Sequence, residues 1–172
     1  ANRLREISRG DGRHGSCGMG IGETVADSLL FGRTVIRAGD LRDSEALARK
    51  LRWLQAYKRG ELRDTIERCR GYAVAAQEIR CLEDDDIADT YIERVRSFIA
   101  DARIVEDSHA GEILRLPGAV IFEGAQGVLI DEWRGFDPYT TWSTCTFDNA
   151  LALLEEHDYG GRVTRWGAVR AY

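Results

Sequence analysis

The residues best suited to chemistry follow an apolar run at residues 120–127, where Val-Ile-Phe gives way to a polar turn. An apolar run bounded by glycine is typical of a buried strand, and open α/β sheets bind ligands just beyond such strand ends. Gln126 stands in this turn between small residues and Gly127. Its amide offers both a donor and an acceptor to the edge of a heterocycle. Gln126 is therefore a candidate site residue, and an ordinary strand-to-loop turn is the alternative.

A second candidate is the Gly-rich loop at residues 15–22, which reads Gly-Ser-Cys-Gly-Met-Gly-Ile-Gly. Successive small residues can turn several backbone N–H groups toward one anion, and Ser16 adds a hydroxyl donor. No Gly-Lys-Ser/Thr ends the loop, so it is not a Walker-type loop. The segment is a candidate phosphate cradle, and a flexible loop is the alternative.

The elements around these two turns are expected to be mostly helical. Apolar residues recur at helical spacing, and Ser44 is a plausible N-cap for the first of these segments. The expected interior of the helix near residue 90 includes Tyr91, Val95 and Phe98. Pro117-Gly118 precedes the expected strand. The sequence predicts helices at residues 44–60, 61–79, 85–102 and 149–156, and a strand at residues 119–122.

Composition excludes several classes of protein. The net charge is −5 with 22 Arg and 2 Lys, and the charges are mixed along the expected helices rather than pooled in a basic stripe. A nucleic-acid footprint is therefore not expected. No apolar run approaches the roughly 20 residues that span a membrane, and a cytoplasmic location is expected. The four cysteines lack metal-type pairing, so reduced thiols and no protein metal site are predicted.

Four motifs in order give the chain a close resemblance to adenylosuccinate synthetases. The Gly-rich loop stands where that family carries Gly-Thr-Thr-Gly-basic-Gly-Ile-Gly. Residues 35–41 are similar to its Leu-Arg-Val-Gly-Asp-Leu segment, and the closing residues 166–172 resemble the approach to its Lys-Ala-Tyr motif. The central match is the strongest, and it comprises residues 122–131, Gly135, residues 138–141 and residues 143–146.

The resemblance implies an α/β fold of the P-loop-NTPase-like kind, of which residues 1–172 would be one helix-rich central fragment with few strands of its own. Family members also carry a Gly-Asp-Glu-Gly-Lys-Gly-Lys phosphate loop, which this sequence does not contain. Within the fragment we expect a Gly-rich, phosphate-contacting region at residues 1–42, a helical subdomain at 43–116, and the strand, Gln126 turn and closing segment at 117–172.

The activity implied by the resemblance is a ligation that uses GTP and Mg²⁺. The enzyme would join L-aspartate to the six-position of IMP through a 6-phosphoryl intermediate and form adenylosuccinate. The residue matching Gln126 would contact the purine near its six-oxygen, where a rigidly held amide N–H stabilises developing charge. Neither GTP nor Mg²⁺ is expected to bind this fragment alone, which we predict to be inactive.

Further contacts follow from the same resemblance. Cys17, beside Ser16 and Gly18, and Thr141 match residues that bind the 5′-phosphate of IMP. Arg33 is the nearest match to an Arg that reaches the partner's nucleotide site in family homodimers, and a surface Arg without a role is the alternative. Cys17, Met19 and Trp142 depart from the family pattern. A ligase for another 6-oxopurine nucleotide, or a non-catalytic nucleotide-binding or dimerisation module, therefore stays open.

Overall fold

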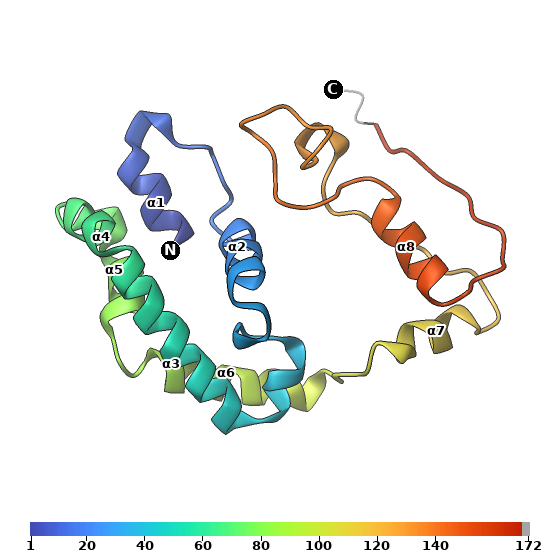
Figure 1. Cartoon of the computed structure of the whole chain (residues 1–172), viewed down its shortest axis with the longest axis horizontal. Coiled ribbons are helices and arrows are strands. Elements are labelled where there is room, and N and C mark those ends of the chain that lie inside the picture. Colours follow the sequence, from blue (N-terminus) through green and yellow to red (C-terminus); the bar gives the residue numbers. More distant parts are fainter. Residues whose placement is uncertain (170–172) are drawn as a thin grey trace. The chain divides into compact units, whose positions relative to one another are not determined.

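The computed structural model describes residues 1–169, and it divides the chain into two compact units, which meet in the sequence at Ile104 and Val105. Figure 1 shows that both units are built from helices and loops. None of the helices described is long and apolar enough to cross a membrane. The first unit contains α1 (Asn2–Arg9), α2 (Ile21–Phe31), α3 (Ser44–Glu61), α4 (Arg63–Cys69), α5 (Ala76–Glu83) and α6 (Ile87–Asp101), and the second α7 (Ser108–Leu114) and α8 (Asp148–Glu156).

Short 3-10 turns connect several of these helices. They are η1 (Gly10–Gly12), η2 (Gly32–Thr34), η3 (Ala38–Arg42), η4 (Ala73–Ala75) and η5 (Val128–Ile130). The division of the chain at residues 1–42, 43–116 and 117–172 stays a prediction.

The helix predicted at residues 44–60 is confirmed as α3, but its N-cap is not the predicted Ser44. α3 begins at Ser44, but the N-cap is Asp43, whose carboxylate accepts hydrogen bonds from the N–H groups of Glu45 and Ala46, both at 3.0 Å. A carboxylate at this position satisfies free N–H groups of the first turn and favours the positive end of the helix dipole. The predicted N-cap Ser44 is instead the first residue of the helix.

The single helix predicted at residues 61–79 is wrong. The chain forms α4 and then α5, with a turn at Gly71 and Tyr72 between them. The Tyr72 N–H donates to the Cys69 carbonyl at 2.9 Å and closes the end of α4. The break lets both short helices direct apolar side chains into one core, which a straight helix could not do. That core consists of Leu4, Leu62, Ile66, Cys69, Ala75, Ile79 and Leu82.

Two helices near the start of the chain were not predicted. α1 supplies Leu4, which is fully buried in the core shared with α4 and α5. α2 follows the Gly-rich loop directly and begins after Gly20, whose φ is +79°. The abundance of glycine hid both helices, although glycine here lies mainly at the ends of the helices.

A second core joins α3 to α6, which lie side by side in Figure 1. Leu47 packs against Ile92 and Val95, and the side chains of Ile36, Leu41, Ala48, Leu51 and Ile99 surround them. The expected burial of Val95 is confirmed. The expected burial of Tyr91 and Phe98 is wrong, since these side chains are exposed. Apolar residues of α6 lie on two neighbouring faces of the helix, one with Tyr91 and Phe98 and one with Ile92. The face with Ile92 is the buried one.

The second unit has little regular structure. The helix predicted at residues 149–156 is confirmed as α8, which begins one residue earlier. The strand predicted at residues 119–122 is wrong, because no strand occurs within residues 1–169. A strand needs ladder hydrogen bonds to a neighbour, and no described segment pairs with these residues. Ile121 is 87% exposed, so the apolar run that suggested a buried strand is not buried here.

Candidate functional site

The candidate residues Gln126 and Thr141 lie together in the second unit. The Gln126 amide nitrogen donates a hydrogen bond to the Thr141 hydroxyl at 3.4 Å, although 15 positions separate them in the sequence. The Cys145 thiol lies 3.8 Å from the Gln126 amide oxygen and 3.4 Å from the Ser143 carbonyl oxygen, and both are acceptors for its proton. Burial raises the pKa of Cys145, and the nearby carboxylates of Asp131 and Glu132 raise it further, so the thiol keeps the proton that it donates. The loops therefore place an amide, a hydroxyl and a thiol within one small region.

Asp131 organises the loop that carries this group. Its side chain is 1% exposed. One carboxylate oxygen accepts the Cys145 N–H at 2.7 Å, and the other accepts the N–H groups of Trp133 and Arg134, both at 2.9 Å. These hydrogen bonds, led by the one from Cys145, lower the pKa of Asp131. Asp131 therefore holds the two ends of the segment 131–145 at a fixed spacing.

The backbone closes the same loop. The Thr141 N–H donates to the Ile130 carbonyl at 2.7 Å, and the Gly135 N–H donates to the Asp131 carbonyl at 2.9 Å. A Cβ atom added at Gly135 would lie 2.5 Å from the Asp131 carbonyl oxygen, so only glycine fits there. Thr141 is thus positioned by its own backbone as well as by Gln126. Asp131 and Gly135 belong to the central motif of the resemblance, but their structural roles were not predicted.

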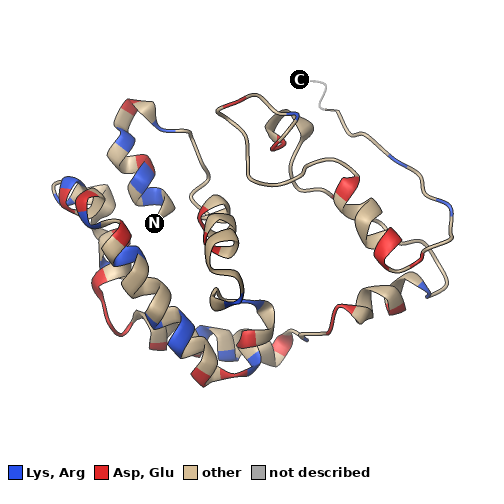
Figure 2. Cartoon of the chain, in the orientation of Figure 1, with Lys and Arg blue, Asp and Glu red and all other residues tan. Residues whose placement is uncertain are grey.

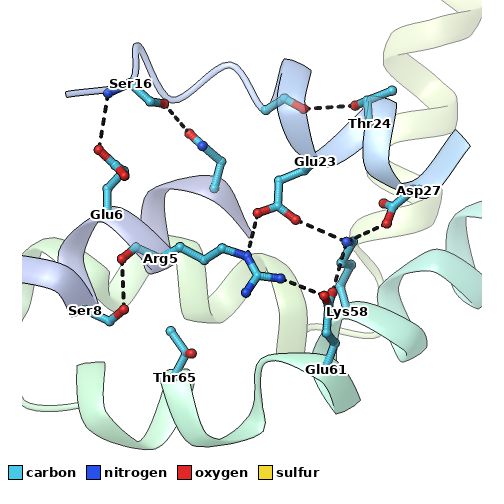
Figure 3. Close-up of polar contacts among 12 residues, drawn as sticks. Arg5, Glu6, Ser8, Ser16, Glu23, Thr24, Asp27, Lys58, Glu61 and Thr65 are labelled. Atoms are coloured by element: carbon cyan, nitrogen blue, oxygen red, sulfur yellow. Dashed lines mark hydrogen bonds and ion pairs between the residues drawn. The ribbon is translucent and has the colours of Figure 1, made fainter. Parts of the chain in front are cut away.

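The Gly-rich loop in the first unit does direct several N–H groups to one anion. That anion is the carboxylate of Glu6, which accepts the N–H of Gly15 at 2.9 Å, of Ser16 at 3.2 Å and of His14 at 3.4 Å. Figure 3 shows Glu6 of α1 directly below the loop at Ser16. The Ser16 hydroxyl donates to the Asn2 amide oxygen at 2.8 Å and accepts the Gly18 N–H at 3.0 Å. The loop is therefore shaped by α1.

Cys17 and Gly18 follow this anchored segment. Gly18 has a φ of +77°, a backbone conformation that favours glycine. Cys17 is exposed, and none of the four cysteines forms a disulfide in the structure. The exposed Cys17 thiol thus lies between Ser16, whose hydroxyl is hydrogen-bonded, and Gly18, whose backbone is left-handed.

Arg33 lies in η2, apart from the Gly-rich loop. No hydrogen bond or ion pair joins the Arg33 side chain to that loop within the described part of the chain. Its backbone is fixed by Lys50, whose ammonium donates to the Arg33 carbonyl at 2.9 Å and to the Val35 carbonyl at 3.0 Å. The same ammonium reaches the Asp40 carboxylate at 2.7 Å. The turn that carries Arg33 is therefore held while its side chain stays exposed.

A buried ion cluster, which sequence reasoning missed, connects α1, α2 and α3. It consists of Arg5, Glu23, Asp27, Lys58 and Glu61, drawn in Figure 3. The Lys58 ammonium lies 2.7 Å from Asp27, 3.0 Å from Glu61 and 3.1 Å from Glu23, and the residue is only 6% exposed. Burial lowers the pKa of Lys58, but hydrogen bonds to the three carboxylates outweigh it and raise the pKa overall.

The two lysines offer a signal that could have located these anchors. The sequence has 22 Arg and only Lys50 and Lys58. Each lysine contacts three oxygen-bearing partners, and all of these except Glu61 lie outside α3. A compact ammonium with three donors fits a site with three converging oxygens better than a planar guanidinium does. A lysine among Arg-rich helices therefore predicts a site with several converging oxygen atoms.

A cavity of about 380 Å³ lies beside the ion cluster in the first unit. Gly18, Met19 and Gly20 form one side of it, and Leu51, Leu54, Leu82 and Ile87 contribute apolar walls. Figure 2 shows that positively and negatively charged residues are interspersed along the helices of the first unit. No group of His, Cys, Asp and Glu within residues 1–169 is arranged to hold a metal ion.

The comparisons with known proteins assign this chain to a class and then to a family. The family model described as adenylosuccinate synthetase matches residues 1–172. An adenylosuccinate synthetase of Thermosynechococcus vestitus is 39% identical over 138 residues, which are 80% of this chain and 28% of the relative. The family model and the matching relatives are all described as synthetases. It belongs to the adenylosuccinate synthetase family.

Other relatives with the same name agree. That of Methylibium petroleiphilum is 36% identical over 151 residues, covering 87% of this chain and 30% of the relative. That of Herminiimonas arsenicoxydans is 34% identical over 148 residues, covering 85% and 31%. The chain thus spans about three-tenths of the length of the curated relatives it matches.

Proposed function

We propose that this chain is the IMP-contacting part of an adenylosuccinate synthetase, which ligates L-aspartate to IMP at the expense of GTP in purine nucleotide biosynthesis. Family membership supports the reaction, and one structural observation supports the site. The Gln126 amide is bound to the Thr141 hydroxyl across a loop closed by Asp131. A fixed amide beside a fixed hydroxyl suits a ligand that offers a purine carbonyl.

Gln126 is the proposed catalytic residue. Its N–H group would donate to the six-oxygen of the purine and stabilise the charge that develops while that oxygen is phosphorylated. Donors held in place before reaction are effective in this role because they need no reorganisation. The hydrogen bond to Thr141 orients the amide nitrogen, and the Cys145 thiol lies 3.8 Å from the amide oxygen. When IMP binds, the Gln126 N–H group would donate to the purine instead of to the Thr141 hydroxyl.

Ser16, Cys17, Gly18 and Thr141 are the proposed contacts to the nucleotide phosphate. The N–H groups of the Gly-rich loop already converge on a carboxylate, which supports an affinity for anions. Arg33 is proposed to reach the nucleotide site of a partner in a homodimer. Its anchored backbone and exposed side chain suit a guanidinium that makes a charge-assisted contact to phosphate.

GTP and Mg²⁺ are proposed to be used by the whole enzyme, whose fold would be α/β and P-loop-NTPase-like. The Gly-Asp-Glu-Gly-Lys-Gly-Lys motif that would bind GTP does not occur in residues 1–172, so the chain by itself is proposed to be inactive. The same proposal places the enzyme in the cytoplasm, without a nucleic-acid or membrane partner.

A coupled assay for adenylosuccinate on the full-length protein tests this function. With GTP, Mg²⁺, IMP and aspartate present, Gln126→Ala should lower kcat about 100-fold or more, the effect of removing one preorganised donor. Gln77→Ala, a change of the same type at an exposed position of α5, should leave kcat unaltered. Turnover with guanosine monophosphate in place of IMP would instead support a variant ligase, and binding of IMP without turnover would support the non-catalytic module.

A further inference from the structure

Glu6 occupies an unusual position for an acidic residue in a candidate phosphate-binding region. Its side chain is only 13% exposed, and its carboxylate receives three consecutive backbone N–H groups, from His14, Gly15 and Ser16. Arg9 neutralises it through an ion pair of 2.7 Å. Burial raises the pKa of Glu6, but the hydrogen bonds from Ser16, Arg9, His14 and Gly15 together lower it. The carboxylate is therefore ionised, paired and saturated with donors.

Two residues on one face of α1 form hydrogen bonds to the Gly-rich loop. Asn2 and Glu6 are separated by one helical turn, so their side chains project from the same side of α1. Asn2 accepts the Ser16 hydroxyl, and Glu6 accepts the Ser16 and Gly15 N–H groups. These bonds fix the segment immediately before Cys17, including the left-handed Gly15 with its φ of +76°. No hydrogen bond to the Cys17 N–H occurs among residues 1–169, so its donor is left for another acceptor.

We propose that Glu6 is a positioning residue for the phosphate loop: it holds residues 14–16 so that the N–H group of Cys17 can bind the phosphate of the nucleotide. The inference rests on the proposed function, because it takes the Gly-rich loop as the phosphate contact. Glu6 itself does not touch the ligand. Its charge is offset by Arg9 and by three N–H dipoles, so it does not repel a phosphate as a free carboxylate would.

The test compares IMP with inosine, which lacks the phosphate, by calorimetric titration of the full-length protein. Glu6→Ala should weaken IMP binding about tenfold, equivalent to one misplaced hydrogen bond to phosphate, and leave inosine binding unaltered. Glu6→Gln keeps the length of the side chain and one acceptor oxygen, so it should retain part of the affinity for IMP. This rescue separates positioning from a general loss of structure.

Glu93→Ala is the matched control. Glu93 also pairs with an Arg three positions along its helix, at 2.6 Å, but it lies on α6 and is 69% exposed. This variant changes the net charge equally and should bind IMP as the wild type does. Hydrogen exchange gives a second readout, since the amides of Gly15 and Ser16 should exchange at least tenfold faster in Glu6→Ala than in Glu93→Ala if Glu6 is their acceptor.

Three results would overturn the inference. Tighter IMP binding by Glu6→Ala would show that Glu6 competes with the phosphate. Equal losses for IMP and inosine would show a structural role only, and unaltered IMP binding would show no role. In all three the wild type binds IMP, so the proposed function stands. If the wild type does not bind IMP, the proposed function fails and this inference fails with it.

Discussion

The two units of this chain are stabilised in different ways. In the first unit, side chains from distant helices meet in two apolar cores and one buried ion cluster. In the second, Leu114 and Leu154 are the buried large apolar side chains of residues 105–169, and the best-organised feature is a loop whose N–H groups bind Asp131. Large side chains such as Trp133 and Trp166 remain more than 80% exposed there.

The residues that stabilise the fold therefore lie mainly in the first unit, and the candidate residues Gln126 and Thr141 lie in the second. The helices of the first unit fix the start of the Gly-rich loop, while the hydrogen-bonded loop of the second fixes Gln126 and Thr141 with few apolar contacts. Substitutions in the first unit should therefore change the free energy of unfolding. Substitutions in the candidate loop of the second should change local order and turnover more than global stability.

The largest expected effect is at the ion cluster. Lys58→Ala leaves Glu23, Asp27 and Glu61 close together without their shared cation, and removing one partner of a buried ion pair costs roughly 3–5 kcal/mol of unfolding free energy. Urea denaturation followed by helical circular dichroism measures this. Arg59→Ala, at the next position in α3 and in an exposed pair, should cost under about 1 kcal/mol. Equal losses in the two variants would contradict the role of the cluster.

The next effect is in the apolar core. Leu4→Ala removes a fully buried side chain that joins α1 to α4, so it should cost about 2–5 kcal/mol of unfolding free energy. Leu29 is of the same type but is 73% exposed on α2, and Leu29→Ala should change the value by no more than about 0.5 kcal/mol. A small loss in Leu4→Ala, seen in the same urea titration, would mean that α1 is not part of the core.

In the second unit the expected effect is local. Asp131→Asn keeps an acceptor for Trp133 and Arg134 but replaces the oxygen that accepts the Cys145 N–H by a donor. The Cys145 amide should therefore exchange faster with solvent, while the melting temperature changes little. Asp137→Asn, an exposed position in the same loop, should leave this exchange unaltered. Hydrogen exchange of the Cys145 amide, measured by mass spectrometry or NMR in both variants, tests this prediction. Equal exchange in Asp131→Asn and Asp137→Asn would contradict it.

The smallest effect is a dependence on pH. Because hydrogen bonds lower the pKa of Asp131 in the folded chain, the carboxylate stabilises the loop fully above its unfolded pKa of about 4. This contribution falls as pH drops through the folded pKa, which lies below that value. Protection of the Cys145 amide, after correction for intrinsic exchange, should therefore be constant from pH 5 to 7 and decline only in more acidic solution. A decline already between pH 7 and 5 would contradict the lowered pKa.

The sequence predicted α3, α6 and α8 to within about two residues, because their apolar spacing and flanking polar residues agree with the packing. It missed α1 and α2, whose glycine-rich surroundings resemble a loop, and it joined α4 to α5 across Gly71. The strand at residues 119–122 could not be decided from periodicity, since a strand forms only when another segment supplies its hydrogen-bond partners.

The contacts of the candidate site were also only partly predictable from the sequence. Motif residues such as Gln126 and Thr141 could be named in advance, because their types and neighbours are distinctive. Glu6, Lys50 and Lys58, which hold the surrounding backbone, could not, because their partners outside their own helices lie 8 to 35 positions away and only the fold brings them together.

The central claim is that this chain supplies the IMP contacts of an adenylosuccinate synthetase, and calorimetric titration of the full-length protein with IMP tests it most directly. The wild type should bind IMP, and Thr141→Ala should bind it about tenfold more weakly, the loss expected for one hydrogen bond to phosphate. Thr90→Ala, at an exposed position on α6, serves as the control and should bind like the wild type. Absence of IMP binding in the wild type, or equal affinity in Thr141→Ala and the wild type, would contradict the account.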